Sequence, residues 1–439
     1  MRSLHVFSNG RLVGVLSDEN NLWQFQYEAP WVADPAAFDL SPHLKKSDAA
    51  IIDGATQRPV QWFFDNLLPE EEMRTALSKE AKLSYEDAFG LLEYLGMESA
   101  GFLVLRPPGV DLAPMPGTQE LSDVALSARI RNLPTSTLGS QAPKRMSAAG
   151  AQHKLLVIYV DGKFHEPVGA TPSTHLLKPD HPGKDEYPSS AINEYAMMKL
   201  AHKLGLDVPP VFRHYCPEPV YIVERFDRVT RGELPVHAPE TERLQMIDTC
   251  QLLNKARSFK YTSANLQTFN QVIDSMRRKG PTRLALFRWL IFNLLIGNND
   301  NHIKNISFFI NQDGRTLAPF YDLLSTATYH TRAFAKGEAI WPHVDLAFPL
   351  PGQPRFADIT RDGVVQAGVV LGLTPRICTR ELDRMLAHIG PHLDRILDDI
   401  AQENAHLPLE CHPYLGGEMR LLRAIRHIVV AEMVGRLAT

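Results

Sequence analysis

Two short apolar runs open the chain, at residues 4–7 and 12–16, and the dipeptide Asn9-Gly10 lies between them. Apolar runs of this length are typical of β-strands, and Asn-Gly is a strong short-range signal for the tight turn of a hairpin. The chain is therefore predicted to begin with a β-hairpin.

Helical patterns replace the strand pattern over residues 70–94, where two short helices are expected. Six prolines and glycines then fall within residues 107–117. Because both residue types interrupt regular structure, this density marks a linker or domain edge. Residues 1–106 are therefore predicted to form a small α+β domain.

Residues 107–228 combine strand and helix patterns. A strand is expected at 155–160, followed by an Asp-Gly turn and a returning strand. Apolar residues recur at every fourth position over 192–204, which predicts an amphipathic helix, and Gly205 lies where a C-cap glycine belongs. Two further strands are expected, at 175–178 and 221–226.

Residues 229–439 are dominated by helical periodicity. The expected helices cover residues 243–253, 265–278, 284–296, 379–388, 393–402 and 418–437. One predicted β-hairpin, at 306–320, interrupts them. The whole chain is thus expected to be α+β, with a mainly helical C-terminal region.

The composition is that of an ordinary globular protein, since 44% of its 439 residues are hydrophobic and 22% are charged. A net charge of −4 argues against tight, non-specific nucleic-acid binding by the chain alone, because such binding needs a large basic surface. The four cysteines are far apart and form no CxxC pair, which favours buried, reduced thiols over a disulfide scaffold or a zinc site.

Targeting signals are not evident. The N-terminal apolar stretch is broken by polar residues and does not resemble the apolar region of a signal peptide. The longest apolar run, residues 289–296, contains Asn293 and is too short to span a bilayer. The sequence therefore predicts no membrane association and a cytoplasmic location.

The most informative stretch is Gly297-Asn-Asn-Asp-Asn-His-Ile-Lys-Asn305, which lies between an apolar helix and the predicted hairpin. After the hairpin comes Asp322. This order, with Asp-x₄-Asn and then Asp, is the layout of a kinase catalytic loop and its metal-binding Asp. Asp300 would orient the attacking hydroxyl, and the hard oxygen donors of Asn305 and Asp322 would hold Mg²⁺. A lone Asp would more often be a turn residue, but the ordered trio favours a kinase.

Lys178 ends a predicted apolar strand and is followed by an amphipathic helix. Kinases hold nucleotide phosphates with a strand lysine that is often braced by a helix carboxylate. Glu194 is a candidate brace, while Glu186 or a surface role for either residue remains an alternative.

Residues 147–154 precede a strand and contain small side chains, which would let backbone N–H groups approach phosphate oxygens. An ordinary turn is the alternative, because the G-x-G-x-x-G spacing is absent. In Val223–Arg228, the backbone of Glu224 and Phe226 could contact adenine, or the segment could hold a structural Arg–Asp pair.

These motifs together resemble the HipA family, the Ser/Thr kinase toxins of bacterial type II toxin–antitoxin pairs. The resemblance rests on S-A-A-G-A-Q-H-K, T-H-L-L-K-P, N-E-Y-A-M-M-K-L-A-H-K-L-G-L-D-V-P, V-E-R-F-D-R, I-G-N-N-D-N-H-I-K-N and P-F-Y-D-L-L-S, in this order, and on F-D-N-L-L-P-E nearer the start. It covers most of the chain. It implies a protein-kinase-like two-lobed fold with an extra N-terminal α+β subdomain at 1–106, an N-lobe-like region at 107–228 and a helical C-lobe at 229–439.

The resemblance also implies functional roles. Asp300 would be the catalytic base, Asn305 and Asp322 the Mg²⁺ ligands, and Ser147 an inactivating autophosphorylation site. The implied ATP-binding residues are Ala149, Gly150, Ala151, Gln152, His153, Lys154, Lys178, Glu224, Phe226 and His302. One departure is His153, where the family motif has Glu, which removes a negative charge beside the phosphate loop.

Family members pair with a small helix-turn-helix antitoxin of the HipB type, so operator DNA would be bound mainly through that partner. Their substrates are aminoacyl-tRNA synthetases, with glutamate–tRNA ligase the first candidate here, and phosphorylation of these enzymes halts translation and promotes persistence. Two alternatives remain open. One is a small-molecule or lipid kinase of related fold, because a fold does not fix the acceptor. The other is a mainly non-catalytic corepressor that acts with its antitoxin.

Overall fold

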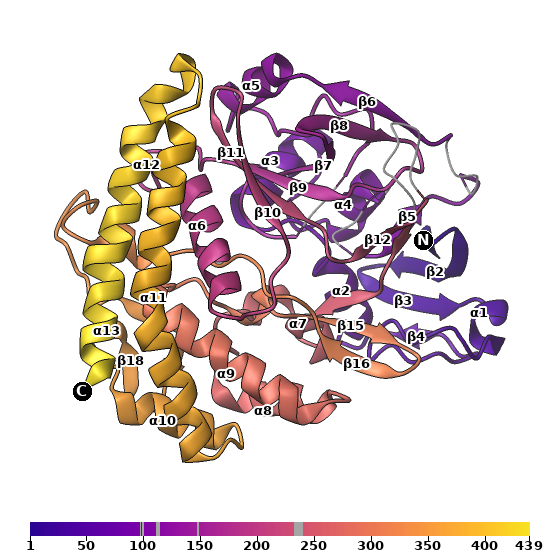
Figure 1. Cartoon of the computed structure of the whole chain (residues 1–439). Helices are drawn as coiled ribbons and strands as arrows, with labels where there is room; N and C mark the ends of the chain where they lie inside the picture. The colour runs from indigo at the N-terminus through magenta and orange to yellow at the C-terminus, as the bar shows by residue number, and fades with distance from the viewer. Residues whose placement is uncertain (97, 99–100, 111–114, 147–148, 232–239) are drawn as a thin grey trace. The chain divides into compact units, whose positions relative to one another are not determined.

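The computed structural model describes residues 1–96, 98, 101–110, 115–146, 149–231 and 240–439. The backbone forms two compact units, each built from several stretches of chain. Figure 1 labels their helices and strands. The first comprises residues 1–178, 223–259 and 307–315, and the second comprises residues 179–222, 260–306 and 316–439. Ser147 lies outside the described residues.

The first unit begins with an antiparallel sheet of strand order β4-β3-β2-β1-β5. Its strands are β1 (Arg2–Ser8), β2 (Arg11–Glu19), β3 (Leu22–Tyr27), β4 (Ile51–Ile52) and β5 (Leu103–Arg106). The predicted hairpin is confirmed, since β1 pairs with β2 and both Asn9 and Gly10 have positive φ. The helices of this region are α1 (Ala29–Ala33), α2 (Pro59–Asp65), α3 (Glu71–Ala81) and α4 (Ala88–Leu95).

A second antiparallel sheet in the first unit has β7 (Leu155–Val160) between β9 (His175–Pro179) and β8 (Lys163–Val168). Strand β6 (Gly117–Leu121) pairs with the outer edge of β8, and helix α5 (Asp123–Arg131) follows β6. The predicted strand at 155–160, its turn and its returning strand are confirmed. Strand β9 carries Lys178 beside the central strand β7.

The prediction of a helix over residues 243–253 is wrong in its first part, where the chain forms strands, and right only for residues 249–252. Strand β13 (Glu240–Arg243) pairs with β12 (Arg228–Arg231), and β14 (Met246–Asp248) pairs with β15 (Ser307–Asn311). Only α7 (Thr249–Leu252) is helical, and Asp248 caps it. Pairing with strands distant in sequence overrides the local helical pattern, because each ladder satisfies the backbone polar groups.

The second unit is mainly helical and contains α6 (Ser190–Lys203), α8 (Leu266–Ser275), α9 (Lys279–Ile296), α10 (Arg361–Val370), α11 (Pro375–Asn404), α12 (His412–Ala424) and α13 (Ala431–Ala438). Its strands are β10 (Val211–Tyr215), most of β11 (Pro219–Glu224), β17 (Asp345–Leu350) and β18 (Gln353–Arg355). Strand β16 (Gly314–Leu317) completes the predicted hairpin with β15. Helix α6 and its C-terminal Gly205, at φ +80°, are as predicted.

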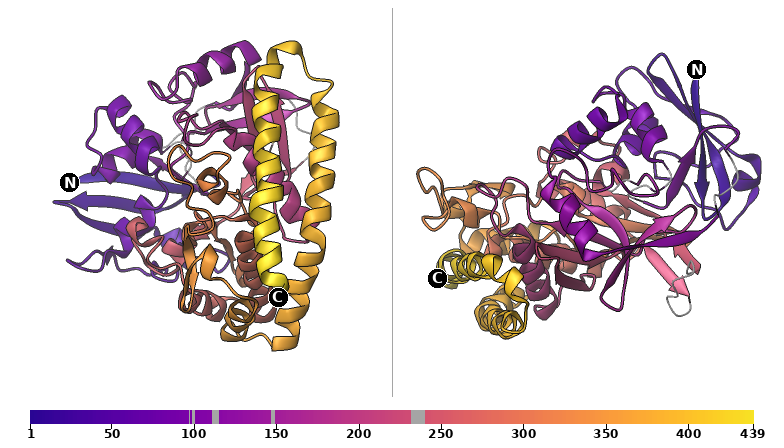
Figure 2. Two further views of the ribbon diagram at one scale, coloured as in Figure 1. Left: turned by 90° about the vertical axis from the view of Figure 1, so that its left-hand side faces the viewer. Right: turned by 90° about the horizontal axis from the view of Figure 1, so that it is seen from above.

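Two helices predicted at 379–388 and 393–402 are in fact one helix, α11, which continues through Pro391. A proline inside a helix costs about 3 kcal/mol. The buried apolar stripe stays in phase across it, from Met385 and Ile389 to Leu393 and Ile396, so packing offsets that cost. Figures 1 and 2 show α11 running beside the chain of α12, the π-helical Ile425–Val430 and α13.

Helix α9 forms the centre of the second unit's core and is buried along most of its length, including Trp289, Leu290 and Phe292. The four cysteines are buried free thiols, in agreement with the sequence. Within the described part of the chain, no helix is both long and apolar enough to cross a membrane.

Candidate active site

The predicted catalytic loop starts where α9 ends. Gly297 caps the helix in the left-handed conformation, at φ +65°, and a Cβ atom there would lie 2.6 Å from Val429 Cγ1. Only glycine satisfies both the backbone angle and this close approach. The glycine of the I-G-N-N-D motif thus fixes the direction in which the loop leaves the helix.

Asn298 holds the next residues in place. Its side chain is buried, donates to Asn293 Oδ1 at 2.7 Å, and accepts from the backbone N–H of Asp300 at 3.0 Å. The Thr326 hydroxyl accepts from the Asn299 N–H at 2.6 Å. These contacts leave little freedom to the backbone that carries Asp300.

The predicted base, Asp300, accepts a hydrogen bond at Oδ1 from the hydroxyl of Tyr261, at 2.5 Å. The Tyr261 ring also meets the ring of His302 edge-on, with centroids 5.0 Å apart. His302, a predicted ATP-binding residue, is buried and lies in the same unit as Asp300. The Asp300 carboxylate is therefore placed where a hydroxyl group can reach it.

The two predicted metal ligands lie in the same unit as Asp300. Asn305 is buried in the short 3-10 turn Ile303–Asn305, and its amide donates to the Asp300 carbonyl at 3.3 Å. Asp322 is partly exposed and has φ +60°, a conformation that few non-glycine residues adopt and that is often found at functional sites. Tyr321, before it, donates to the Lys304 carbonyl at 2.8 Å.

Helix α6 is hydrogen-bonded to the chain segment that follows Asp322. The buried Asn193 side chain donates to the Ser325 carbonyl at 3.0 Å and accepts from its N–H at 2.8 Å. Its neighbour Glu194 is also buried. Burial raises the pKa of the Tyr221 hydroxyl well above its usual range, and the nearby carboxylates of Glu194 and Asp322 add to the rise. Glu194 thus faces Tyr221 within the second unit, and its role as a lysine brace stays a prediction.

The donor atoms of Asn305 and Asp322 show which kind of metal site these two residues could form. In the described residues no group of three or more His, Cys, Asp and Glu could hold a metal ion. The predicted ligands Asn305 and Asp322 would supply one amide and one carboxylate oxygen, which is too few for a protein-only site. Mg²⁺ in nucleotide enzymes often takes one or two protein ligands together with substrate phosphates, so this donor set fits a metal that arrives with nucleotide.

The predicted nucleotide residues of the first unit fall on three segments, of which the first two carry Lys178 and the phosphate loop. Lys178 is buried on β9. In the phosphate-loop segment, Gly150 has φ +106°, and its carbonyl accepts from the Glu70 N–H at 3.2 Å. Lys154 Nζ donates to the Ala149 carbonyl at 2.5 Å. His153, the departure from the family motif, is buried rather than exposed to solvent.

The segment predicted to contact adenine contains the structural Arg–Asp pair that was its alternative reading. Arg225 donates to the two Asp227 oxygens at 3.0 and 2.8 Å, and both residues are buried. Glu224 is exposed, and the Phe226 ring meets the Phe309 ring edge-on. Adenine contact through the backbone groups of Glu224 and Phe226 stays a prediction.

A catalytic-type Asp after a capped helix, an Asn five residues on, a hairpin and a further Asp define a phosphotransferase of the kinase class. The chain belongs to the HipA family of serine/threonine kinase toxins. Residues 4–106 match the HipA N-terminal domain, and residues 146–389 match the HipA-like C-terminal domain.

Relatives and a solved structure agree with this family. The chain is 33% identical to "Putative kinase Y4mE" of Sinorhizobium fredii, over 91% of this chain and 93% of that protein. It is 30% identical to the serine/threonine-protein kinase toxin HipA of Shewanella oneidensis, over 92% and 94%. Its fold matches HipA in the Shewanella oneidensis complex of HipA, HipB and operator DNA, with TM-score 0.75, 23% identity and 99% of both chains covered.

Sequence reasoning missed two residues that contact or support the predicted site. Tyr261 lies 39 residues before Asp300 and outside every motif, so no local signal marked it. Asn193 was part of a quoted motif, but its hydrogen bonds to Ser325, 132 residues away, could not be read from that motif. Only the folded chain brings these residues together.

Proposed function

We propose that the protein is an ATP- and Mg²⁺-dependent serine/threonine kinase in which Asp300 is the catalytic base. The observation that carries this proposal is the Asp300 carboxylate, which already accepts a hydrogen bond from a hydroxyl group at 2.5 Å on a loop fixed by Gly297 and Asn298. A kinase base needs this ability to orient a hydroxyl.

Each remaining residue has a defined task in the proposed reaction. Bound ATP supplies the phosphoryl group, and Mg²⁺ offsets the negative charge of its phosphates. Asn305 and Asp322 would hold the metal, Lys178 would bind phosphate oxygens, and backbone N–H groups of residues 149–154 would cover the phosphates. Asp300 orients the acceptor hydroxyl and takes its proton as the oxygen bonds to phosphorus and ADP leaves.

The proposed acceptor is an aminoacyl-tRNA synthetase, with glutamate–tRNA ligase first, whose phosphorylation halts translation and promotes persistence. We expect this protein to encounter such a substrate in the cytoplasm. The proposed partner is a HipB-like antitoxin, supported by the Shewanella complex that contains HipA, HipB and operator DNA. A net charge of −4 supports DNA contact mainly through this partner.

Ser147 is the proposed autophosphorylation site. It stands at the front of the phosphate-loop segment, two residues before Ala149. A phosphate group there would add about −1.5 to −2 charges to the chain two positions before the predicted phosphate loop. Repulsion between this group and the ATP phosphates would disfavour nucleotide binding, which gives a physical reason for inactivation.

Intact-mass measurement after incubation with Mg²⁺-ATP tests the catalytic and regulatory parts together. We expect wild-type protein to gain one phosphate and both Asp300→Ala and Ser147→Ala to gain none. A gain that persists in Ser147→Ala would move the modified serine but leave the kinase. A gain in Asp300→Ala would remove Asp300 as the base.

The acceptor is tested with purified aminoacyl-tRNA synthetases and radiolabelled ATP, using Asp300→Ala as the blank. Label on glutamate–tRNA ligase is expected. Turnover on an aminoglycoside or an inositol lipid, without label on any protein, would favour a small-molecule kinase. Cellular toxicity that is equal in wild type and Asp300→Ala would favour the corepressor function.

A further inference from the structure

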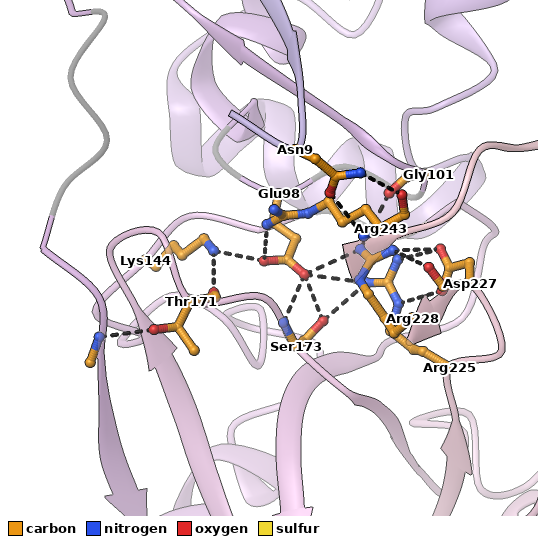
Figure 3. Close-up of polar contacts among 11 residues, drawn as sticks. Asn9, Glu98, Gly101, Lys144, Thr171, Ser173, Arg225, Asp227, Arg228 and Arg243 are labelled. Atoms are coloured by element: carbon orange, nitrogen blue, oxygen red, sulfur yellow. Dashed lines mark hydrogen bonds and ion pairs between the residues drawn. The ribbon is translucent and has the colours of Figure 1, made fainter. Parts of the chain in front are cut away.

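A buried carboxylate in the first unit lies at the centre of a dense polar cluster (Figure 3). Glu98 has no exposed surface. Its Oε2 accepts from Lys144 Nζ at 2.6 Å, and its Oε1 accepts from the backbone N–H and the hydroxyl of Ser173 at 2.9 and 2.7 Å. Lys144 Nζ also donates to the Thr171 carbonyl at 2.8 Å.

Three arginines surround the same carboxylate. Arg225 and Arg228 lie 3.5 and 3.4 Å from Glu98 Oε1, and Arg243 lies 3.5 Å from Oε2. Arg225 also donates to the Ser173 hydroxyl at 3.0 Å. Asp227 pairs with both Arg225 and Arg228. Four cations therefore share two carboxylates, and Glu98 is the one that reaches all four.

Three of the segments that contact Glu98 flank the predicted nucleotide residues. Lys144 precedes Ala149 by five positions along the approach to the phosphate loop. Ser173 lies just before β9, the strand of Lys178. Arg225 is next to Glu224 and Phe226, and its N–H donates to the Thr174 carbonyl at 2.9 Å. Glu98 itself belongs to the part of the chain that matches the HipA N-terminal domain.

We propose that Glu98 is a positioning residue for nucleotide binding, which lets the N-terminal domain set the spacing of the phosphate loop, the lysine strand and the 224–228 segment. This inference rests on the proposed nucleotide residues. Glu98 touches no part of the nucleotide in this proposal and acts through Lys144, Ser173 and Arg225.

The charge of Glu98 is essential to this role. Burial alone would raise the pKa of its carboxyl, but the cations around it, Lys144 foremost, hold the pKa well below its usual range. The group is therefore ionised at neutral pH. Without that charge, the buried cations would repel one another and draw in water, and the three segments would lose their common anchor.

The test compares Glu98→Gln with Glu166→Gln. Glutamine keeps the shape of glutamate and removes its charge. Glu166 is a matched control because it is also buried and accepts from Arg129 at 2.6 and 2.9 Å, but it joins β8 to α5. The readouts are KM for ATP, kcat, and the thermal shift caused by Mg²⁺-ATP, each on full-length protein.

We expect Glu98→Gln to raise KM for ATP on the order of tenfold, a size typical of coupling between distinct sites, with a smaller change in kcat. Its thermal shift with ATP should shrink, while Glu166→Gln keeps the wild-type KM and shift. Equal effects of the two substitutions would reduce Glu98 to a structural role and overturn the proposal.

Ser173→Ala is a second variant that tests the proposal if Glu98→Gln does not fold. It keeps every charge and removes the hydroxyl that links Glu98 to Arg225, so KM for ATP should rise roughly two- to tenfold, the equivalent of one hydrogen bond. An unchanged KM in Ser173→Ala would then overturn the proposal. If wild-type protein neither binds nor uses ATP, the proposed kinase function itself is refuted. This result distinguishes failure of the kinase proposal from failure of the Glu98 proposal.

Discussion

The hydroxyl of Tyr261 donates to Oδ1 of Asp300 at 2.5 Å, so one oxygen of the proposed base has a defined hydrogen-bond partner. A donor to the ionised carboxylate favours its charged form. We expect Tyr261→Phe to lower kcat several-fold, about the effect of one hydrogen bond, and to shift the acidic limb of the pH–rate profile to higher pH. The profile of kcat against pH measures both effects.

Tyr187→Phe is the control for this substitution, because Tyr187 belongs to the same unit and is as exposed as Tyr261, at 42%. It should leave the profile unchanged. Faster turnover in Tyr261→Phe would contradict the positioning role, and would mean that the tyrosine hydroxyl competes with the acceptor for Asp300.

Because only Asn305 and Asp322 are proposed as protein ligands of Mg²⁺, loss of Asp322 should strongly weaken metal binding. We expect Asp322→Asn to weaken the apparent affinity for Mg²⁺ at saturating ATP on the order of 10–100-fold or more, because changes even to outer-shell residues have effects of that size. Titration of activity with Mg²⁺ measures this. Asp345→Asn, an exposed carboxylate of the same unit, should leave the titration unchanged. An unaltered Mg²⁺ requirement in Asp322→Asn would remove it from the metal site.

The capping glycine of α9 makes a prediction about stability. Gly297→Ala combines a left-handed backbone with a Cβ atom 2.6 Å from Val429, so the free energy of unfolding should fall by roughly 2–4 kcal/mol. Chemical denaturation measures the loss. Gly416→Ala in helix α12 of the same unit is the control, because a Cβ atom there meets nothing within 4 Å, and it should stabilise slightly. Equal stability of the two variants would contradict the close packing around Gly297.

A buried glutamate on α12 predicts a pH dependence. Burial, together with Asp180, raises the pKa of Glu418 from 4.5 to about 7. Between pH 4.5 and about pH 7, Glu418 keeps a proton in the folded protein that it releases in the unfolded chain. The stability contributed by this group is therefore fully present below pH 4.5 and is lost as the pH rises to about 7.

Glu418→Gln removes this titration and keeps an oxygen that can accept from the Tyr215 hydroxyl, which lies 2.7 Å from Glu418 Oε2. We expect the variant to lose less stability than wild type between pH 5 and 8 and to be more stable at pH 8 by roughly 1–3 kcal/mol. Some slope should remain, because burial also raises the pKa of Asp180, to about 6. Melting temperatures across this range measure the difference. Parallel curves for the two proteins would contradict it.

Local signals in the sequence were sufficient for several parts of this protein. The turn at Asn9-Gly10, helix α6 with Gly205, and the order of Asp300, Asn305 and Asp322 around a hairpin were all legible. Each depends on residues within a few positions of one another, and turn chemistry, helical periodicity and motif spacing act over that range. The family followed from the same motifs.

Other features depended on contacts between distant residues, and only the tertiary structure decided them. Strand pairing made residues 240–248 extended, and packing carried α11 through Pro391. The Tyr261 hydroxyl on Asp300 and the cations around Glu98 join positions that no periodic pattern links. A buried charge or a shared hydrogen bond gains its energy from the groups that folding places around it, and the sequence near either partner does not encode which groups those are.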